Sequence, residues 1–239
     1  NPRASRTVPL VSKVCNIRMV PLATDIITSE LTGRPSPVKD LKEQVIPYYG
    51  VKEAVFPFNM FQEVDPVLGP EMRSTGEVLG LSASYGEAFY KAQEATQSTL
   101  PLSGTVLISV NKRDKVESVE VAKKLYNDGF KILATGDTYV RITEAGIPAE
   151  KVKKLDEGRP NVLDIITNNQ VDLIVNSPVG KDSKTDDSYL RKAAIKAKVP
   201  YITTMAAALA TADGIHKVKT NANDDIKSLQ ELHNEIHDA

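Results

Sequence analysis

The sequence of 239 residues contains a single cysteine, Cys15, so it cannot form a disulfide within the chain or supply a cysteine-rich zinc module. It has no Asn-x-Ser/Thr acceptor, which suits a reducing compartment, and we expect a soluble protein of the cytoplasm. No apolar run approaches the roughly 20 residues of a membrane span, and no basic-then-apolar leader opens the sequence. The sequence therefore predicts no membrane partner.

Charge of one sign is also lacking, because 30 Lys and Arg residues stand against 31 Asp and Glu residues. A near-neutral chain has no overall attraction for nucleic acid, so we expect none as a partner. The sequence has no Gly-x-Gly-x-x-Gly loop, Walker loop, His-Glu-x-x-His motif or nucleophile elbow. The sequence therefore lacks the usual motifs of dinucleotide-binding, zinc and serine-hydrolase proteins. We expect the function to be carried by specific pockets.

Between Gly104 and Thr204 the sequence repeats a short apolar strand, a polar turn and an amphipathic helix. The strands are TVLISV (105–110), FKILAT (130–135), VDLIVNS (171–177) and PYITT (200–204). Because they are rich in β-branched residues and lack polar alternation, we expect them to be buried on both faces of a parallel sheet. The spacing predicts right-handed crossovers and an α/β, doubly wound, Rossmann-like fold.

Helices are expected around the predicted strands, at residues 114–127, 139–145, 161–168, 188–196, 205–212 and 226–236. Before Gly104 the patterns predict a helix over 19–31, strands and turns over 44–63, a short strand over 76–81 and a helix over 84–99. Ser84 and Glu87 have the spacing of a capping box. The three histidines lack clustered partners and are expected to be structural: His216, His233 and His237.

Polar residues gather where the predicted strands end, in NKRDK, ATGDT and NSPVG. Thr135 and Thr138 stand where a strand leads into a helix, and hydroxyls with backbone N–H groups at a helix N-terminus favour a phosphate. Lys115 and Lys154 would add charge-assisted contacts, and Asn176 would bind a sugar hydroxyl or a phosphate oxygen. These residues predict an anion site at the carboxyl edge of the sheet.

Each of these residues also has a plain structural interpretation. The two threonines can cap the helix, the two lysines can be solvated surface charges, and Asn176 can bond to its own turn. Asp137 opposes phosphate binding unless it points away, although an acid in the first turn of a helix is also an ordinary partner of the helix dipole. The residues leave both interpretations open.

Five motifs resemble the large subunit of carbamoyl phosphate synthetase: NPRASRTVPLVSK, PFNMFQEVDPVLGPEMRSTGEVLG, ATGDT, EGRPN and TT. Their order agrees along almost the whole length. The resemblance implies that residues 1–103 are the carboxyl-terminal part of an ATP-grasp synthetase unit, an incomplete α+β tail. It implies that residues 104–239 form a regulatory domain with a methylglyoxal-synthase-like fold, so that the chain is a fragment.

The resemblance implies a role in an ATP-dependent ligase that forms carbamoyl phosphate from bicarbonate and glutamine-derived ammonia, for pyrimidine and arginine synthesis. In the full enzyme ATP and Mg²⁺ or Mn²⁺ are the expected cofactors, whereas none is expected in the isolated regulatory domain. The expected partners are the rest of the large subunit, the small glutaminase subunit, nucleotide or ornithine effectors and, in a homo-oligomer, further copies of the chain. The fragment alone is expected to be non-catalytic.

The resemblance also assigns residues. It places a metal-binding residue at Asn1, an ATP-phosphate residue at Arg3 and an ornithine-type site at Glu53 and Thr203. The nucleotide-effector contacts fall on the residues of the predicted anion site: Lys115, Thr135, Thr138, Lys154 and Asn176. The two lines of reasoning therefore agree on one site.

Three residues depart from the family pattern and bear on nucleotide control: Asp137, Pro178 and Met60. A first alternative is a lyase that eliminates phosphate from dihydroxyacetone phosphate, as the fold relative does. That reaction needs a carboxylate base, which the turn Gly158–Asn161 lacks. A second alternative is a purely structural or oligomerising domain, which would self-associate without responding to an effector.

Overall fold

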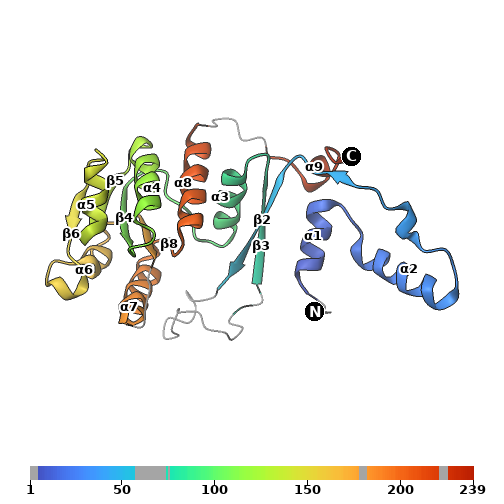
Figure 1. The fold of residues 1–239 in the computed structure, drawn as a ribbon, viewed down its shortest axis with the longest axis horizontal. Helices are drawn as coiled ribbons and strands as arrows, with labels where there is room; N and C mark the ends of the chain where they lie inside the picture. Colours follow the sequence, from blue (N-terminus) through green and yellow to red (C-terminus); the bar gives the residue numbers. More distant parts are fainter. Residues whose placement is uncertain (1–4, 57–73, 75, 178–181, 221–225) are drawn as a thin grey trace.

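The computed structural model describes residues 5–56, 74, 76–177, 182–220 and 226–239. The molecule is elongated, with a layered α/β body at one end and two helices, α1 (Thr7–Cys15) and α2 (Met19–Thr32), at the other (Figure 1). Between them lies an antiparallel hairpin of β2 (Tyr49–Val55) and β3 (Gly76–Ser82), followed by helix α3 (Tyr85–Ala95).

The α/β body is built on a five-stranded sheet in the order β6-β5-β4-β7-β8, and every pair in it is parallel. Its strands are β4 (Thr105–Val110), β5 (Lys131–Thr135), β6 (Glu150–Val152), β7 (Leu173–Ser177) and β8 (Tyr201–Ile202). The four strands predicted between Gly104 and Thr204 are confirmed, some of them shortened at their ends. The fifth, β6, is a short edge strand that the sequence analysis missed.

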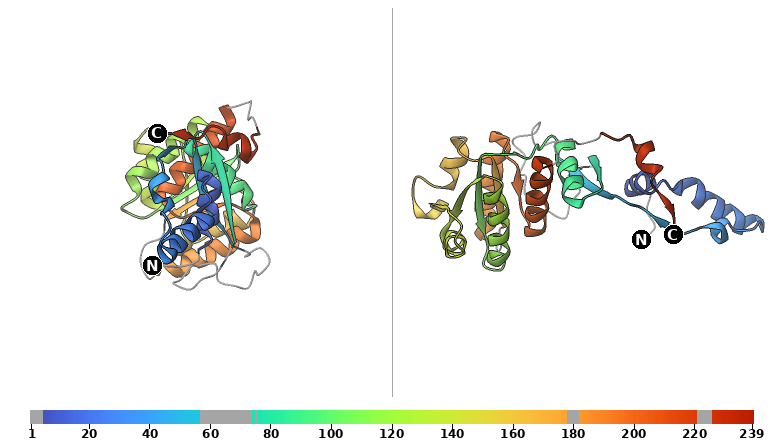
Figure 2. Two further views of the ribbon diagram at one scale, coloured as in Figure 1. Left: turned by 90° about the vertical axis from the view of Figure 1, so that its right-hand side faces the viewer. Right: turned by 90° about the horizontal axis from the view of Figure 1, so that it is seen from above.

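Helices cover both faces of this sheet, which confirms the predicted doubly wound α/β class. Val106, Ile108 and Val110 of β4 face a buried cluster with the helices α4 (Lys115–Asn127), α5 (Gly136–Glu144) and α8 (Met205–Thr220). Leu107, on the opposite face of β4, packs with α6 (Val162–Thr167) and α7 (Asp182–Ala197). Figure 2 shows α4 and α5 on one side of the sheet and α6 and α7 on the other. A 3-10 turn, η3 (Leu155–Glu157), precedes α6.

The N-terminal part follows its expected elements within the described residues. Helix α2 ends at Gly33 in the left-handed conformation, and the hydroxyl of Ser84 accepts a hydrogen bond from the N–H of Glu87 at the start of α3. Helix α1, which the sequence analysis did not predict, has no buried residue. A 3-10 turn, η1 (Pro37–Asp40), and strand β1 (Gln44–Val45) connect α2 to the hairpin.

The end of the chain returns to the N-terminal part. Strand β9 (His237–Asp238) pairs antiparallel with β1, and the predicted helix over 226–236 is shortened to α9 (Leu229–His233). The Nε2 atom of His233 lies 2.5 Å from the carbonyl oxygen of Lys13. His216 of α8 pairs with Asp128 at 2.8 Å. These two histidines therefore join elements that are far apart in sequence.

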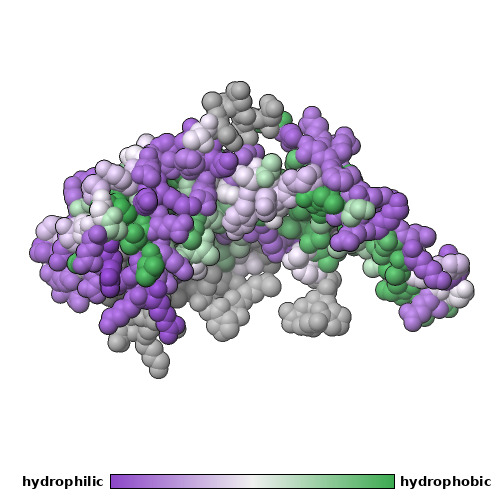
Figure 3. Space-filling view, turned by 45° about the horizontal axis from the view of Figure 1, so that its top comes forward, coloured by the Kyte–Doolittle hydropathy of each residue, from purple (hydrophilic) through white to green (hydrophobic). Residues whose placement is uncertain are grey.

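Apolar side chains lie exposed along α2 and the segment after it (Figure 3). They are Val20, Ile27, Leu31, Val38 and Leu41. Large apolar side chains on one surface are common at sites of contact with another protein or domain. Among the described helices, none has the length and apolar character to cross a membrane.

Helix α3 packs against α8 with their backbones in contact. A Cβ atom at Gly214 would lie 2.5 Å from the carbonyl oxygen of Gly86, so neither residue has room for a side chain. Phe89 and Tyr90 of α3 belong to the same buried cluster as the sheet residues. Residues on both sides of position 103 thus share one core, and the domain boundary there stays a prediction.

We predict that Gly214→Ala lowers the free energy of unfolding by about 1–3 kcal/mol, because the added methyl group must push α3 away from α8. Helix propensity alone would change the stability in the opposite direction, by about 1 kcal/mol. Urea unfolding followed by circular dichroism measures the difference. Ala206→Ser, at an exposed position of α8, is the control and should have little effect. A Gly214→Ala protein that is more stable than the original would contradict this packing.

Candidate effector site

Polar side chains form a row across three strands at the carboxyl edge of the sheet. Ser109 of β4 is in register with Asn176 of β7, and Thr135 ends the neighbouring strand β5. The hydroxyl of Thr135 donates a hydrogen bond to Ser109 Oγ at 2.8 Å. Thr135 is the N-cap of α5, yet its hydroxyl makes no capping bond. The structural interpretation of Thr135 as a capping side chain is therefore wrong.

Lys115 turns back over the end of β4. Its Nζ donates hydrogen bonds to the carbonyl oxygen of Val110 at 3.3 Å and to the hydroxyl of Thr138 at 3.1 Å. Thr138 lies in the first turn of α5 and is buried. The ammonium group is therefore held against the N-terminus of α5, where it is partly removed from water.

Burial lowers the pKa of Lys115, and the neighbouring charges act on it in both directions. The carboxylate of Asp137 raises this pKa, whereas the cations Lys154, Arg141 and Lys112 lower it further. Among the described residues, these three cations thus act on a partly desolvated ammonium against the carboxylate of Asp137. An anion at this position would favour the charged form of Lys115.

Lys154 lies beside the first residue of α5. A Cβ atom at Gly136 would come within 3.3 Å of Lys154 Cε and 3.7 Å of Lys154 Nζ. Gly136 has a φ of +44°, a left-handed conformation that glycine adopts readily. Four of the predicted site residues are thus brought to the start of α5: Lys115, Thr135, Thr138 and Lys154.

Asn176 belongs to a buried polar network that sequence reasoning missed. Its Nδ2 donates to Asp187 Oδ1 at 3.0 Å and to the hydroxyl of Tyr201 at 2.6 Å, whereas the turn that follows it, residues 178–181, lies outside the described residues. The Tyr201 hydroxyl donates to the same Asp187 oxygen at 2.7 Å. Arg191 Nε donates to Asp187 Oδ2 at 2.6 Å, and its guanidinium lies 5.3 Å from the centre of the Tyr201 ring. The spacing of Asp187 and Arg191 on one helix is the only signal in the sequence for this network.

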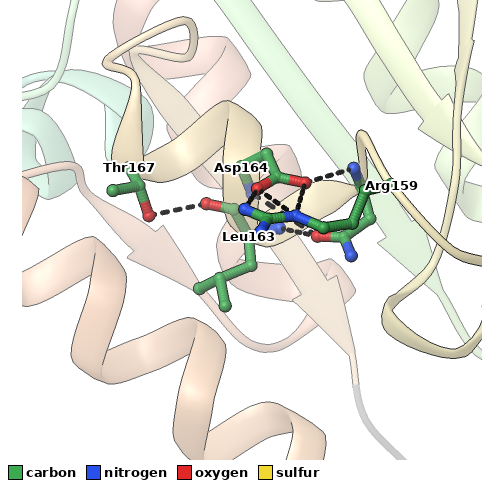
Figure 4. A network of polar contacts seen from close by, with 5 residues as sticks. Arg159, Leu163, Asp164 and Thr167 are labelled. Carbon is green, nitrogen blue, oxygen red and sulfur yellow. Dashed lines mark hydrogen bonds and ion pairs between the residues drawn. The ribbon is translucent and has the colours of Figure 1, made fainter.

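The turn Gly158–Asn161 offers no free carboxylate. Arg159 forms an ion pair with Asp164, whose Oδ2 also accepts the backbone N–H of Asn161 at 2.9 Å (Figure 4). The hydrogen bond from Arg159 is the main cause of the lowered pKa of Asp164. Asp164 is therefore a weakened base and does not replace the carboxylate that the lyase reaction needs.

The two residues of the ornithine-type site lie on different elements. Glu53 is on the half-buried face of β2 beside Val51, which packs against the main core. Thr203 follows β8 and is half-buried. Burial raises the pKa of Glu53, and no ion pair to it occurs among the residues that the structure describes.

The remaining assigned residues lie outside the described part of the chain. They are Asn1, Arg3, Met60 and Pro178. Within the described residues, no group of three or more His, Cys, Asp or Glu side chains is arranged to hold a metal ion.

Comparison with known proteins assigns the sheet domain to a class. Residues 117–203, from α4 to the end of β8, match the MGS-like domain family. A crystal structure of methylglyoxal synthase from Elizabethkingia anophelis NUHP1 is 18% identical, with a TM-score of 0.39, and covers 47% of this chain and 79% of that one. That likeness is too distant to bear on function. The class of the sheet domain is thus the MGS-like domain.

Two curated relatives extend the similarity to nearly the whole chain. The carbamoyl phosphate synthase large chain of Gemmatimonas aurantiaca is 46% identical over 98% of this chain and 21% of its own length. The protein named "Carbamoyl phosphate synthase large chain, C-terminal section" of Methanopyrus kandleri is 48% identical over 92% of this chain and 41% of its own. The chain therefore spans less than half of either relative. It corresponds to the carboxyl-terminal region of a carbamoyl phosphate synthase large chain and includes the MGS-like domain.

We predict that Glu53→Gln raises the free energy of unfolding at pH 7 by about 0.5 kcal/mol after allowance for solvent screening. Burial raises the folded pKa of this carboxyl above its usual 4.5, so the charged form is penalised above the folded pKa. The gain should shrink as the pH falls through the folded pKa and vanish below pH 4.5.

Urea unfolding at several pH values provides the measurement. Glu77→Gln is the matched control, because Glu77 on the partner strand has an ion pair with Lys52 and its substitution should not stabilise the protein. A constant difference between Glu53→Gln and the original chain across this pH range would show that Glu53 is not penalised by burial.

Proposed function

We propose that the MGS-like domain is the effector-binding module of a carbamoyl phosphate synthase large chain and that it binds a phosphorylated nucleotide at the start of α5. The observation that carries this proposal is the contact of the Lys115 ammonium with the buried hydroxyl of Thr138. An ammonium, a hydroxyl and a helix N-terminus are the groups that bind phosphate in many proteins.

The electrostatic balance of the site supports the same ligand class. Lys115 loses hydration and lies near further cations, which lowers its pKa. A dianionic phosphate supplies the missing countercharge, so binding stabilises the charged lysine as well as the ligand. Asp137 limits the affinity, because its carboxylate lies in the first turn of the same helix.

A second effector site lies at Glu53 and Thr203 in this proposal. The half-buried carboxylate of Glu53 would pair with the amino group of an ornithine-type ligand, and the hydroxyl of Thr203 would add a hydrogen bond. Residues 1–103 and 104–239 are the proposed units, so this site would lie between them. The buried core shared by α3 and α8 supports a coupling of the two sites.

The whole enzyme would form carbamoyl phosphate from bicarbonate and ammonia or glutamine, with ATP and Mg²⁺ or Mn²⁺, in the cytoplasm. Asn1 and Arg3 are the residues proposed to face the metal and the ATP phosphates. The exposed apolar residues of α2 are the proposed contact with the rest of the large chain, which would in turn bind the small glutaminase subunit. This chain alone would not catalyse the reaction.

We predict that Lys115→Met weakens the binding of uridine and inosine monophosphates by roughly ten- to a hundredfold, the value of a charge-assisted hydrogen bond. Calorimetric titration of the full 239-residue chain measures the dissociation constants. Lys123→Met, at an exposed position of the same helix, is the matched control and should leave the affinity unchanged.

The absence of heat at millimolar nucleotide, with a folded sample of the original chain, would exclude nucleotide sensing. Equal affinities for the original chain and Lys115→Met would instead show that the phosphate group binds somewhere other than the start of α5.

A further inference from the structure

We propose that Asn111 is a positioning residue of the effector site: it ties the ends of β4 and β7 together and holds the loop from which Lys115 reaches the start of α5. This inference rests on the proposed function, because Lys115 is the residue that carries that proposal. It goes further by assigning a role to a side chain that belongs to neither the predicted anion site nor the residues implied by the family resemblance.

Asn111 follows β4 directly, beside the end of the neighbouring strand β7. Val110, the last residue of β4, is in register with Ser177, the last residue of β7. The backbone N–H of Asn111 donates to Ser177 Oγ at 3.3 Å. Its Nδ2 donates to the same oxygen at 3.0 Å and to the carbonyl oxygen of Ser177 at 3.2 Å. Asn111 therefore continues the pairing of the two strands beyond the end of the sheet.

The same side chain fixes the loop between β4 and α4. Asn111 Nδ2 donates to Asp114 Oδ2 at 2.6 Å, and Asn111 Oδ1 accepts the backbone N–H of Arg113 at 2.8 Å. A carboxylate accepts and a backbone N–H donates, so these two contacts assign the nitrogen and the oxygen of the amide. The loop of residues 111–114 is thus held by its own first side chain immediately before Lys115.

Asp114 makes this contact in place of the usual capping bond. It is the N-cap residue of α4, yet its side chain makes no capping hydrogen bond, and its backbone lies at φ −91° and ψ 0°, outside the extended region typical of a capping residue. Asn111 therefore holds the carboxylate of Asp114 in place. Without the amide, this carboxylate could turn toward the helix or toward Lys115, and the second movement would make it compete with an anionic ligand.

Lys115 is the first residue of α4 and folds back over the strand end that Asn111 holds. Its Nζ donates to the carbonyl oxygen of Val110, the residue directly before Asn111, at 3.3 Å and to the hydroxyl of Thr138 at 3.1 Å. Lysine has a flexible four-carbon stem, so its ammonium keeps one position only where the backbone that carries it is fixed. Asn111 supplies that fixed backbone on the β4 side of the site.

The first measurement follows the pKa of Lys115 in the full chain without ligand, through the carbon NMR resonance of its Cε atom, which Lys115→Met identifies. Burial is the main cause that lowers this pKa from its ordinary value of 10.5. In Asn111→Ala the ammonium should move toward water and toward the released carboxylate of Asp114, and both changes raise the pKa. Asn127→Ala, at the exposed end of the same helix, is the control and should leave the pKa unchanged.

Calorimetric titration with uridine monophosphate then measures the effect on binding. Asn111→Ala should weaken binding about fivefold, because part of the charge-assisted contact of Lys115 is lost. In the Lys115→Met background the same substitution should change the affinity less than about twofold, since the residue through which Asn111 acts is gone. An equal fold-change in both backgrounds would indicate general damage or direct contact with the ligand, and it would overturn the positioning role.

Ser177→Ala is a second variant that keeps the asparagine, and it decides the test if Asn111→Ala does not fold. It removes the Oγ atom that accepts from Asn111, so the pKa of Lys115 and the affinity should change in the same directions by a smaller amount. An unchanged Lys115 pKa in the folded variants would overturn this inference and leave the proposed function standing. Failure of the original chain to bind any nucleotide would overturn the proposed function and this inference with it.

Discussion

The arrangement of the molecule depends on the central strand β4, which is buried on both faces and pairs with β5 on one side and β7 on the other. From β4 the chain moves outward through β5 and β6, and it then crosses back to build β7 and β8. The direction of the sheet order therefore reverses next to β4. At such a reversal the connections from the two neighbouring strands run to opposite faces of the sheet, and the crevice between them can hold a ligand. Lys115, Thr138 and Asn176 come from the three strand ends around it.

The parts of the fold that the sequence predicts are those in which burial leaves a clear pattern. The strands β4, β5 and β7 lack a regular alternation of polar and apolar residues because helices cover both faces, and this distinguishes them from half-exposed strands. Strand β6 was missed because it has three residues at the sheet edge and only Val152 is buried. Helix α1 was missed although Val8, Val11 and Val14 recur at helical spacing, and none of its residues is fully buried.

The candidate site divides in the same way. Lys115, Thr135 and Thr138 were predicted because they lie at or shortly after the ends of predicted strands, and strand ends meet at one edge. Lys154 was predicted from its charge, and the strand before it, β6, was not. The partners of Asn176 were missed because the contact of Tyr201 with Asn176 spans 25 positions and arises from the pairing of β7 with β8. No local pattern records which strands are neighbours, and the partner of a buried amide therefore requires the structure.

The two proposed effector sites each contain a partly buried charged side chain that lacks sufficient charge of the opposite sign nearby, and the two side chains have opposite charges. Lys115 is a partly buried cation with more cations than anions near it, and Glu53 is a half-buried anion without an ion pair among the described residues. The charged form of each side chain is destabilised in the folded chain, and a ligand of the opposite charge would stabilise it. Because α3 and α8 share one core with backbone contact at Gly86 and Gly214, relief at one position can change the packing that supports the other. Coupling of this kind needs only that each ligand prefer the same arrangement of the two helices.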